Sequence, residues 1–170
     1  MRRGVYIVAS FLALVLGSCD SKHATPLAPQ EKITRNSPEP DHQIANIFPD
    51  ANEVRLFVEA ENSGVNGVQK FRNPRGRILE SRQRADFEKA LYLTDPPDQV
   101  AACFDPHHFF RYYNHGHQIG VVAVCFCCGG VEVTGDAHLP SSNQIVAAKY
   151  DQIKKVVVAL GEPTNVICGN

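Results

Sequence analysis

The sequence has no block of lysine and arginine residues and no basic stripe interleaved with aromatic side chains. Its formal net charge is −1, from 17 Lys and Arg residues against 18 Asp and Glu residues. Proteins that bind nucleic acids neutralise backbone phosphates with such basic patches. We therefore expect no nucleic-acid partner.

The sequence also lacks the short motifs that mark common enzyme classes. It has no Gly-x-Ser-x-Gly motif, no His-Glu-x-x-His motif, no phosphate-binding glycine loop and no dinucleotide fingerprint. Its acidic residues are scattered, and no spacing isolates a catalytic pair. Hydrolytic and nucleotide-dependent chemistry therefore has no residues to carry it, and we expect a non-enzymatic protein with no catalytic residues and no bound organic cofactor.

No apolar run is long enough for a helix that spans a membrane. The run from Val5 to Leu16 is apolar apart from Ser10 and has 12 residues, whereas a membrane-spanning helix needs about 20. It follows Arg2 and Arg3 and precedes small residues, which is the arrangement of an export signal peptide. We expect residues 1–18 to be such a signal.

The segment Leu16-Gly17-Ser18-Cys19 resembles the lipobox of bacterial lipoproteins. The resemblance implies cleavage after residue 18, lipid on the Cys19 thiol, and a place in the cell envelope on the outer side of the cytoplasmic membrane. In a Gram-negative cell this is the periplasmic face, and Asp20 then favours the inner membrane. Each buried methylene of an acyl chain contributes about 0.8 kcal/mol to membrane binding, so lipid on Cys19 is the expected contact with the membrane. The alternative is an ordinary signal peptide with a chance cysteine.

The remainder divides into a tether and one folded domain. Residues 19–50 are rich in Pro, Ser, Asn, Gln and charged residues, and such a stretch has too little apolar surface to offset the entropy of ordering it. We expect a flexible tether there. Residues 51–170 suit a single domain with one core.

Hydrophobic periodicity in this domain predicts an α+β fold, a small antiparallel sheet with helices packed on one face. Alternation favours strands over 54–60, 100–104, 107–113, 119–127 and 131–134. Three- and four-residue spacing of apolar residues predicts a helix from Arg82 to Leu93 and a second, final helix. Ser141 or Ser142 caps the start of the final helix, and Gly161 ends it. The apolar stripe of this helix consists of Val146, Tyr150, Ile153, Val157 and Leu160.

The predicted hairpin allows an estimate of which cysteines face each other. A turn between His115 and Gly116 places Cys103 opposite Cys128, and on the same count His107 lies opposite Val124. Opposed side chains are close enough for a disulfide after slight distortion. A bulge at Gly116 would pair Cys103 with Cys127 instead, and we prefer Cys128.

Three interpretations of this cysteine and histidine cluster are open. The first is a disulfide staple from Cys103 to Cys125 or Cys128, which would contribute about 3 to 4 kcal/mol. The second is a zinc site formed by Cys103, Cys125, Cys128 and His108 or His107; a regular strand is an unusual place for such a site. The third is thiol redox chemistry at Cys125 and Cys128, although no helix begins there to lower a thiol pKa.

The same region is similar to a group of bacterial proteins without an assigned activity, which share a Cys-Phe-x-Pro-x-His pattern followed by Cys-Phe-x-Cys. The resemblance covers 26 residues and implies a shared fold and a shared site, but no substrate. The pattern falls on Cys103, Phe104, Pro106, His108, Cys125, Phe126 and Cys128, and leaves Cys127 and Cys168 as extras. We therefore expect a lipid-anchored envelope protein with a binding or structural domain, in which the cysteine cluster is a disulfide staple.

Overall fold

The fold is built on a five-stranded antiparallel sheet, seen in a computed structural model that describes residues 43–44, 46–61, 68–97, 103–140 and 143–166. The strand order is β2-β1-β4-β5-β6, and every neighbouring pair is antiparallel. These strands are β1 (Glu53–Val58), β2 (Arg77–Ile78), β4 (His108–Asn114), β5 (His117–Cys125) and β6 (Gly130–Gly135).

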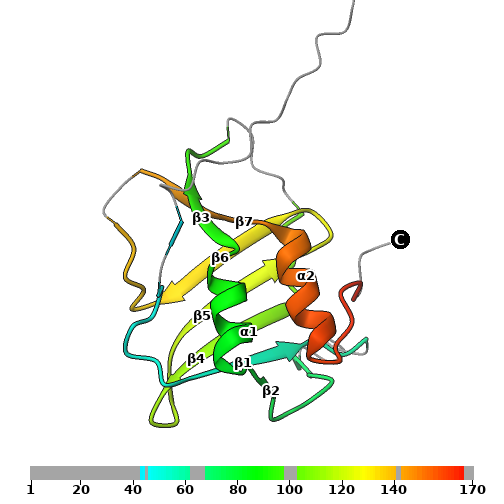
Figure 1. The fold of residues 1–170 in the computed structure, drawn as a ribbon. Helices are drawn as coiled ribbons and strands as arrows, with labels where there is room; N and C mark the ends of the chain where they lie inside the picture. The colour runs from blue at the N-terminus through cyan, green and yellow to red at the C-terminus, as the bar shows by residue number, and fades with distance from the viewer. Residues whose placement is uncertain (1–42, 45, 62–67, 98–102, 141–142, 167–170) are drawn as a thin grey trace, which may run out of the picture. The chain divides into compact units, whose positions relative to one another are not determined.

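A smaller sheet and two helices complete the described part. Strands β3 (Leu91–Thr94) and β7 (Ile145–Ala148) pair antiparallel with each other. Helices α1 (Ser81–Glu88) and α2 (Tyr150–Ala159) both lie on the same face of the five-stranded sheet (Figure 1). The predicted α+β fold is therefore confirmed.

The hydrophobic core lies between this face of the sheet and the two helices. Alternation along β1 buries Leu56, and alternation along β4 buries Phe110. The Phe110 ring stacks on that of Phe87 from α1, with ring centroids 3.7 Å apart. Ile153 and Val157 of α2 are fully buried in the same core. Neither of these helices is long and apolar enough to cross a membrane.

The predicted hairpin between β4 and β5 is present, with a shift in register. His115 and Gly116 both adopt positive φ, 47° and 85°, as a tight hairpin turn requires. The pairing shifts by one residue between Tyr112 and Tyr113, because an extra residue of β5 is accommodated there. As a result His108, and not His107, lies opposite Val124.

Two predicted helices are partly strand. The helix expected up to Leu93 ends at Glu88, and the stripe expected to begin at Val146 is helical only from Tyr150. The intervening residues pair in register, with Leu93 opposite Val146. Short apolar stretches fit both periods, and here the pairing of β3 with β7 decided the outcome. Of the expected strand at 100–104, only 103 and 104 are described, and neither lies in a strand.

The folded unit begins before the predicted tether ends. Ile44, Ile47 and Phe48 lie within the predicted tether, yet they are buried in the core. A Cβ at Gly120 of β5 would overlap the Phe48 ring, so a glycine is needed where this ring packs on the sheet. The folded unit therefore includes residues before the predicted boundary at residue 50, which the sequence does not indicate because three apolar residues within a polar stretch give no periodic signal.

Candidate thiol site

Three cysteines meet at the end of β5. Cys125 is the last residue of this strand, and Cys128 lies in the turn that follows. The Gly129 N–H donates to the Cys125 carbonyl over 3.1 Å, and Gly129 has a φ of +69°, which favours glycine. This turn folds Cys128 back over Cys125, next to Cys103 in the segment that leads into β4.

The sulfur atoms are close but not bonded. The Sγ atoms of Cys125 and Cys128 are 3.0 Å apart, compared with about 2.05 Å in a disulfide. The Cys128 thiol donates to the Cys103 carbonyl over 2.8 Å, and all three residues are free cysteines. The structure thus brings together three of the predicted site residues, and the staple itself stays a prediction.

These three thiols differ in accessibility. The Cys125 side chain is buried, with 1% of its surface exposed, whereas Cys128 is half-buried and Cys103 is exposed. A molecule in solution can therefore reach Cys103 and Cys128 but not Cys125.

The pKa values of Cys125 and Cys128 are shifted in opposite directions. Burial alone would raise the pKa of Cys125, but hydrogen bonds from the Cys128 thiol and from the backbone N–H groups of Cys128, Asp105 and Cys127 outweigh it and lower this pKa. The Cys125 thiol, followed by burial and the Cys103 thiol, raises the pKa of Cys128 to about 12. Of the two thiols, Cys125 is therefore the one that loses its proton first.

Cys127, between the two thiols in sequence, is disulfide-bonded. Its partner lies outside the described residues.

The two candidate histidines have other partners. The Nε2–H of His108 donates to the Pro163 carbonyl over 2.7 Å. His107 Nδ1 lies 2.6 Å from a carboxylate oxygen of Glu59. Within the described ranges no group of three or more His, Cys, Asp or Glu residues is arranged to hold a metal ion. The four ligands of the predicted zinc site are therefore not assembled.

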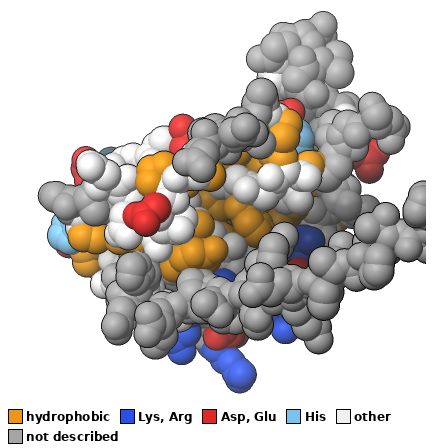
Figure 2. All heavy atoms as spheres, turned by 90° about the horizontal axis from the view of Figure 1, so that it is seen from above, with side chains coloured by type: hydrophobic (Ala, Val, Ile, Leu, Met, Phe, Trp, Pro, Cys, Tyr) orange, Lys and Arg blue, Asp and Glu red, His pale blue; other side chains and the backbone are white. Residues whose placement is uncertain are grey.

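An apolar cavity of about 520 Å³ opens beside Cys128. Sequence reasoning did not find it, because its walls come from segments far apart in the chain. Hydrophobic side chains gather on the face seen from above in Figure 2. Besides Cys128, the walls of the cavity include Phe104, Val131, Ile145, Val146 and Tyr150.

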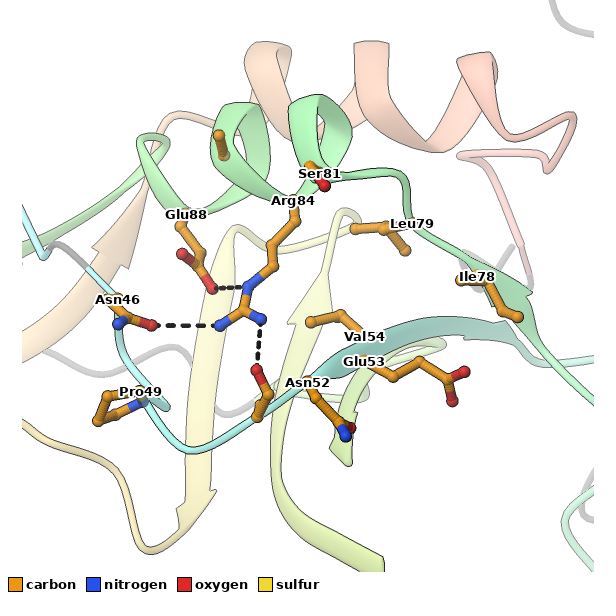
Figure 3. A pocket seen from close by; sticks show the side chains of 12 residues that line it. Asn46, Pro49, Asn52, Glu53, Val54, Ile78, Leu79, Ser81, Arg84 and Glu88 are labelled. Carbon is orange, nitrogen blue, oxygen red and sulfur yellow. Dashed lines mark hydrogen bonds and ion pairs between the residues drawn. The ribbon is translucent and has the colours of Figure 1, made fainter. Parts of the chain in front are cut away.

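A second cavity, of about 540 Å³, lies between α1 and the segment before β1 (Figure 3). Its central side chain is Arg84, which donates to Glu88 over 2.9 Å and to the Ala51 carbonyl over 2.7 Å. The remaining donor nitrogen reaches Asn46 at 3.1 Å and the Phe48 carbonyl at 3.2 Å. All three nitrogens of this guanidinium are hydrogen-bonded to groups of the protein itself. The thiol cluster is therefore the better candidate for a functional site.

No protein-family model, curated protein or solved structure matches this chain.

Proposed function

We propose that the chain is a membrane-anchored lipoprotein of the cell envelope, whose folded domain has a binding or structural role and not a catalytic one. The observation that carries the proposal is the segment Leu16-Gly17-Ser18-Cys19 directly after a short apolar run with two arginines before it. Cys19 lies outside the described residues, and the anchor rests on the sequence alone.

Within the domain we propose that Cys125 and Cys128 close as a disulfide in the oxidising compartment outside the cytoplasmic membrane. Their Sγ separation of 3.0 Å supports this pair over one that includes Cys103. On the chain-entropy estimate a four-residue loop contributes about 2 kcal/mol, and the 26-residue loop from Cys103 to Cys128 would contribute about 3.5 kcal/mol. A disulfide between Cys125 and Cys128 would thus stabilise the fold less than the Cys103–Cys128 disulfide expected from the sequence.

Mass spectrometry of the protein from bacterial membranes tests the anchor. We expect a mature chain that begins at Cys19 and carries acyl groups, and we expect Cys19→Ser to release the protein from the membrane fraction. A matched Ser18→Ala change keeps a small residue before the cut and should leave the anchor intact. An intact leader with an unmodified Cys19 would contradict the proposal.

Thiol counting on denatured, unreduced protein tests the staple. Closure of Cys125 onto Cys128 leaves Cys103 as the only one of the three clustered cysteines that reacts. Reaction at Cys103, Cys125 and Cys128 together would contradict the staple.

Elemental analysis of the same sample, purified without a histidine tag, tests the metal alternative. A content close to one zinc per chain would support a site at Cys103, Cys125, Cys128 and a histidine over the staple.

Thiol–disulfide exchange is the second candidate function. It is favoured by the opposite pKa directions of Cys125 and Cys128, because a lowered pKa makes a thiol a better leaving group. The sequence alone disfavoured this function, since no helix begins at the thiols. The structure provides backbone N–H groups of a turn in the place of a helix end.

A further inference from the structure

We propose that Cys128 is the exchange sulfur of a thiol–disulfide centre whose substrate is a cysteine-containing exported polypeptide with an apolar side chain beside its cysteine. The proposal deepens the second candidate function and relies on the proposed export only for an oxidising compartment. It names the attacked sulfur, the leaving group and the part of the substrate that is recognised.

Accessibility identifies the attacked sulfur. When Cys125 and Cys128 are joined, a substrate thiolate can reach Cys128, which is half-buried and lines the cavity, but not Cys125, which is 1% exposed. Exchange requires attack along the bond at an accessible sulfur. The geometry therefore directs the reaction to Cys128.

The attack balances as a displacement at sulfur. The substrate sulfur forms a bond to Cys128 Sγ, the bond from Cys128 to Cys125 breaks, and its electron pair remains on Cys125 as a thiolate. Backbone N–H groups of Asp105 and Cys127 stabilise that thiolate. The second thiol of the substrate then attacks the substrate sulfur that is bonded to Cys128, and Cys128 leaves with that bond's electron pair. The two protons lost by the substrate thiols end on Cys128 and Cys125, so the substrate dithiol is oxidised to a disulfide and the protein disulfide is reduced to two thiols.

Cys103 is placed to release a substrate that remains bonded to Cys128 as a mixed disulfide. Its exposed thiol lies next to Cys128 and contributes to the high pKa of that group. If the substrate has no second thiol, Cys125 can attack Cys128 and restore the original disulfide, and Cys103 can attack Cys128 and form a Cys103–Cys128 disulfide. Both reactions release the substrate as a thiol, so Cys103 adds a second route of release. A substrate with a single cysteine should therefore stay bound longer when Cys103 is replaced by serine.

The cavity determines which side chain is favoured next to the cysteine of the substrate. Its walls beside Cys128 are the apolar side chains of Phe104, Val131, Ile145 and Tyr150. A polypeptide whose cysteine reaches Cys128 must place a neighbouring side chain against these walls. Burying one large apolar side chain contributes about 1.5 to 3 kcal/mol, which corresponds to about a tenfold or greater preference over a polar one.

The test uses the full-length oxidised chain and two synthetic peptides that each contain one cysteine, flanked by leucine in one and by serine in the other. In Cys103→Ser we expect a mixed disulfide that peptide mapping places on Cys128, formed about tenfold faster with the leucine peptide. Mapping of the mixed disulfide to Cys125, or equal rates for the two peptides on the unchanged chain, would overturn the proposal.

A matched pair of variants tests the cavity. Ile145→Ser removes an apolar side chain that lines it, and Val158→Ser removes one of similar size on α2 that does not. Both side chains are exposed, by 42% and 63%, so both variants should fold. We expect the preference for leucine to fall only in Ile145→Ser; an equal fall in both variants would contradict the assigned cavity. These measurements do not involve Cys19, so the anchor and the exchange centre can fail independently.

Discussion

His108 illustrates at the scale of a residue how burial links protonation to folding. Only 1% of its surface is exposed, and its ring meets the Phe126 ring edge-on at 4.6 Å. Burial lowers the pKa of His108, and the hydrogen bond to the Pro163 carbonyl opposes this only in part. The neutral imidazole is therefore the form that the folded protein accommodates.

This shift predicts a loss of stability in acid. The unfolded chain binds a proton at His108 below about pH 6.5, whereas the folded chain binds it only at lower pH, so the stabilisation is present above pH 6.5 and is lost as pH falls through the folded value. We expect His108→Gln to weaken this dependence, because an amide can still donate to Pro163 but does not titrate. Urea midpoints between pH 4.5 and 7.5 measure the effect. The exposed His117→Gln serves as control, and equal pH dependence in His108→Gln and the unchanged chain would contradict the prediction.

At the scale of elements, the single side chain of Arg84 fixes α1 against the segment that precedes β1. The guanidinium bridges Glu88 of the helix to the carbonyls of Ala51 and Phe48, as Figure 3 shows in part. A planar guanidinium can serve these partners at once, whereas an ammonium group lacks the fork geometry. This contact positions the Phe48 segment for burial.

Replacement of Arg84 by lysine should therefore destabilise the fold by about 1 to 3 kcal/mol, through partly unsatisfied carbonyls. The urea midpoint measures this change, and faster proteolysis around residues 46–52 should accompany it. Arg82→Lys on the same helix is the control, since the Arg82 side chain is 92% exposed and 4.0 Å from its acidic neighbour. Equal midpoints for the two variants would show that the bridge contributes nothing.

The described unit as a whole includes residues that precede the sheet in sequence. Ile47 and Phe48 are fully buried, and Gln43 forms a bridge to Tyr92 of β3. Each large apolar side chain contributes about 1.5 to 3 kcal/mol when buried. Together they amount to a large part of the stability of a domain of this size.

Truncation tests this boundary directly. A chain that begins at Asn36 should fold with the same thermal midpoint as one that begins at Cys19, and a chain that begins at Asn52 should be largely unfolded. Circular dichroism and thermal melts measure both. A cooperative transition in the shorter chain would show that the segment is dispensable and would restore the boundary at residue 50.

Peptide mapping of Cys127 links the envelope proposal to the covalent structure. If the Cys19 sulfur carries lipid, it is not available for a disulfide, and with Cys103, Cys125 and Cys128 free we expect Cys168 to be the partner of Cys127 within the chain. We expect a peptide that joins Cys127 to Cys168. A Cys19–Cys127 peptide would contradict lipidation of Cys19.

Features that depend on neighbouring residues could be predicted from the amino-acid sequence. Alternating side chains predicted β1 and β4, and the residues at 115 and 116 predicted the hairpin turn. The same local rules predicted helices on one face of an antiparallel sheet. These features were predictable because turn geometry and side-chain periodicity act over a few residues.

Features that depend on contacts between distant segments became evident only in the folded chain. Residues at the ends of two predicted helices are strands because β3 pairs with β7. Phe48 is buried because its ring packs on Gly120. His108 donates a hydrogen bond to the Pro163 carbonyl. The cavity beside Cys128 likewise arises where the turn after β5 meets β7 and α2. Each of these depends on contacts between residues far apart in the chain, which no local pattern of residues encodes.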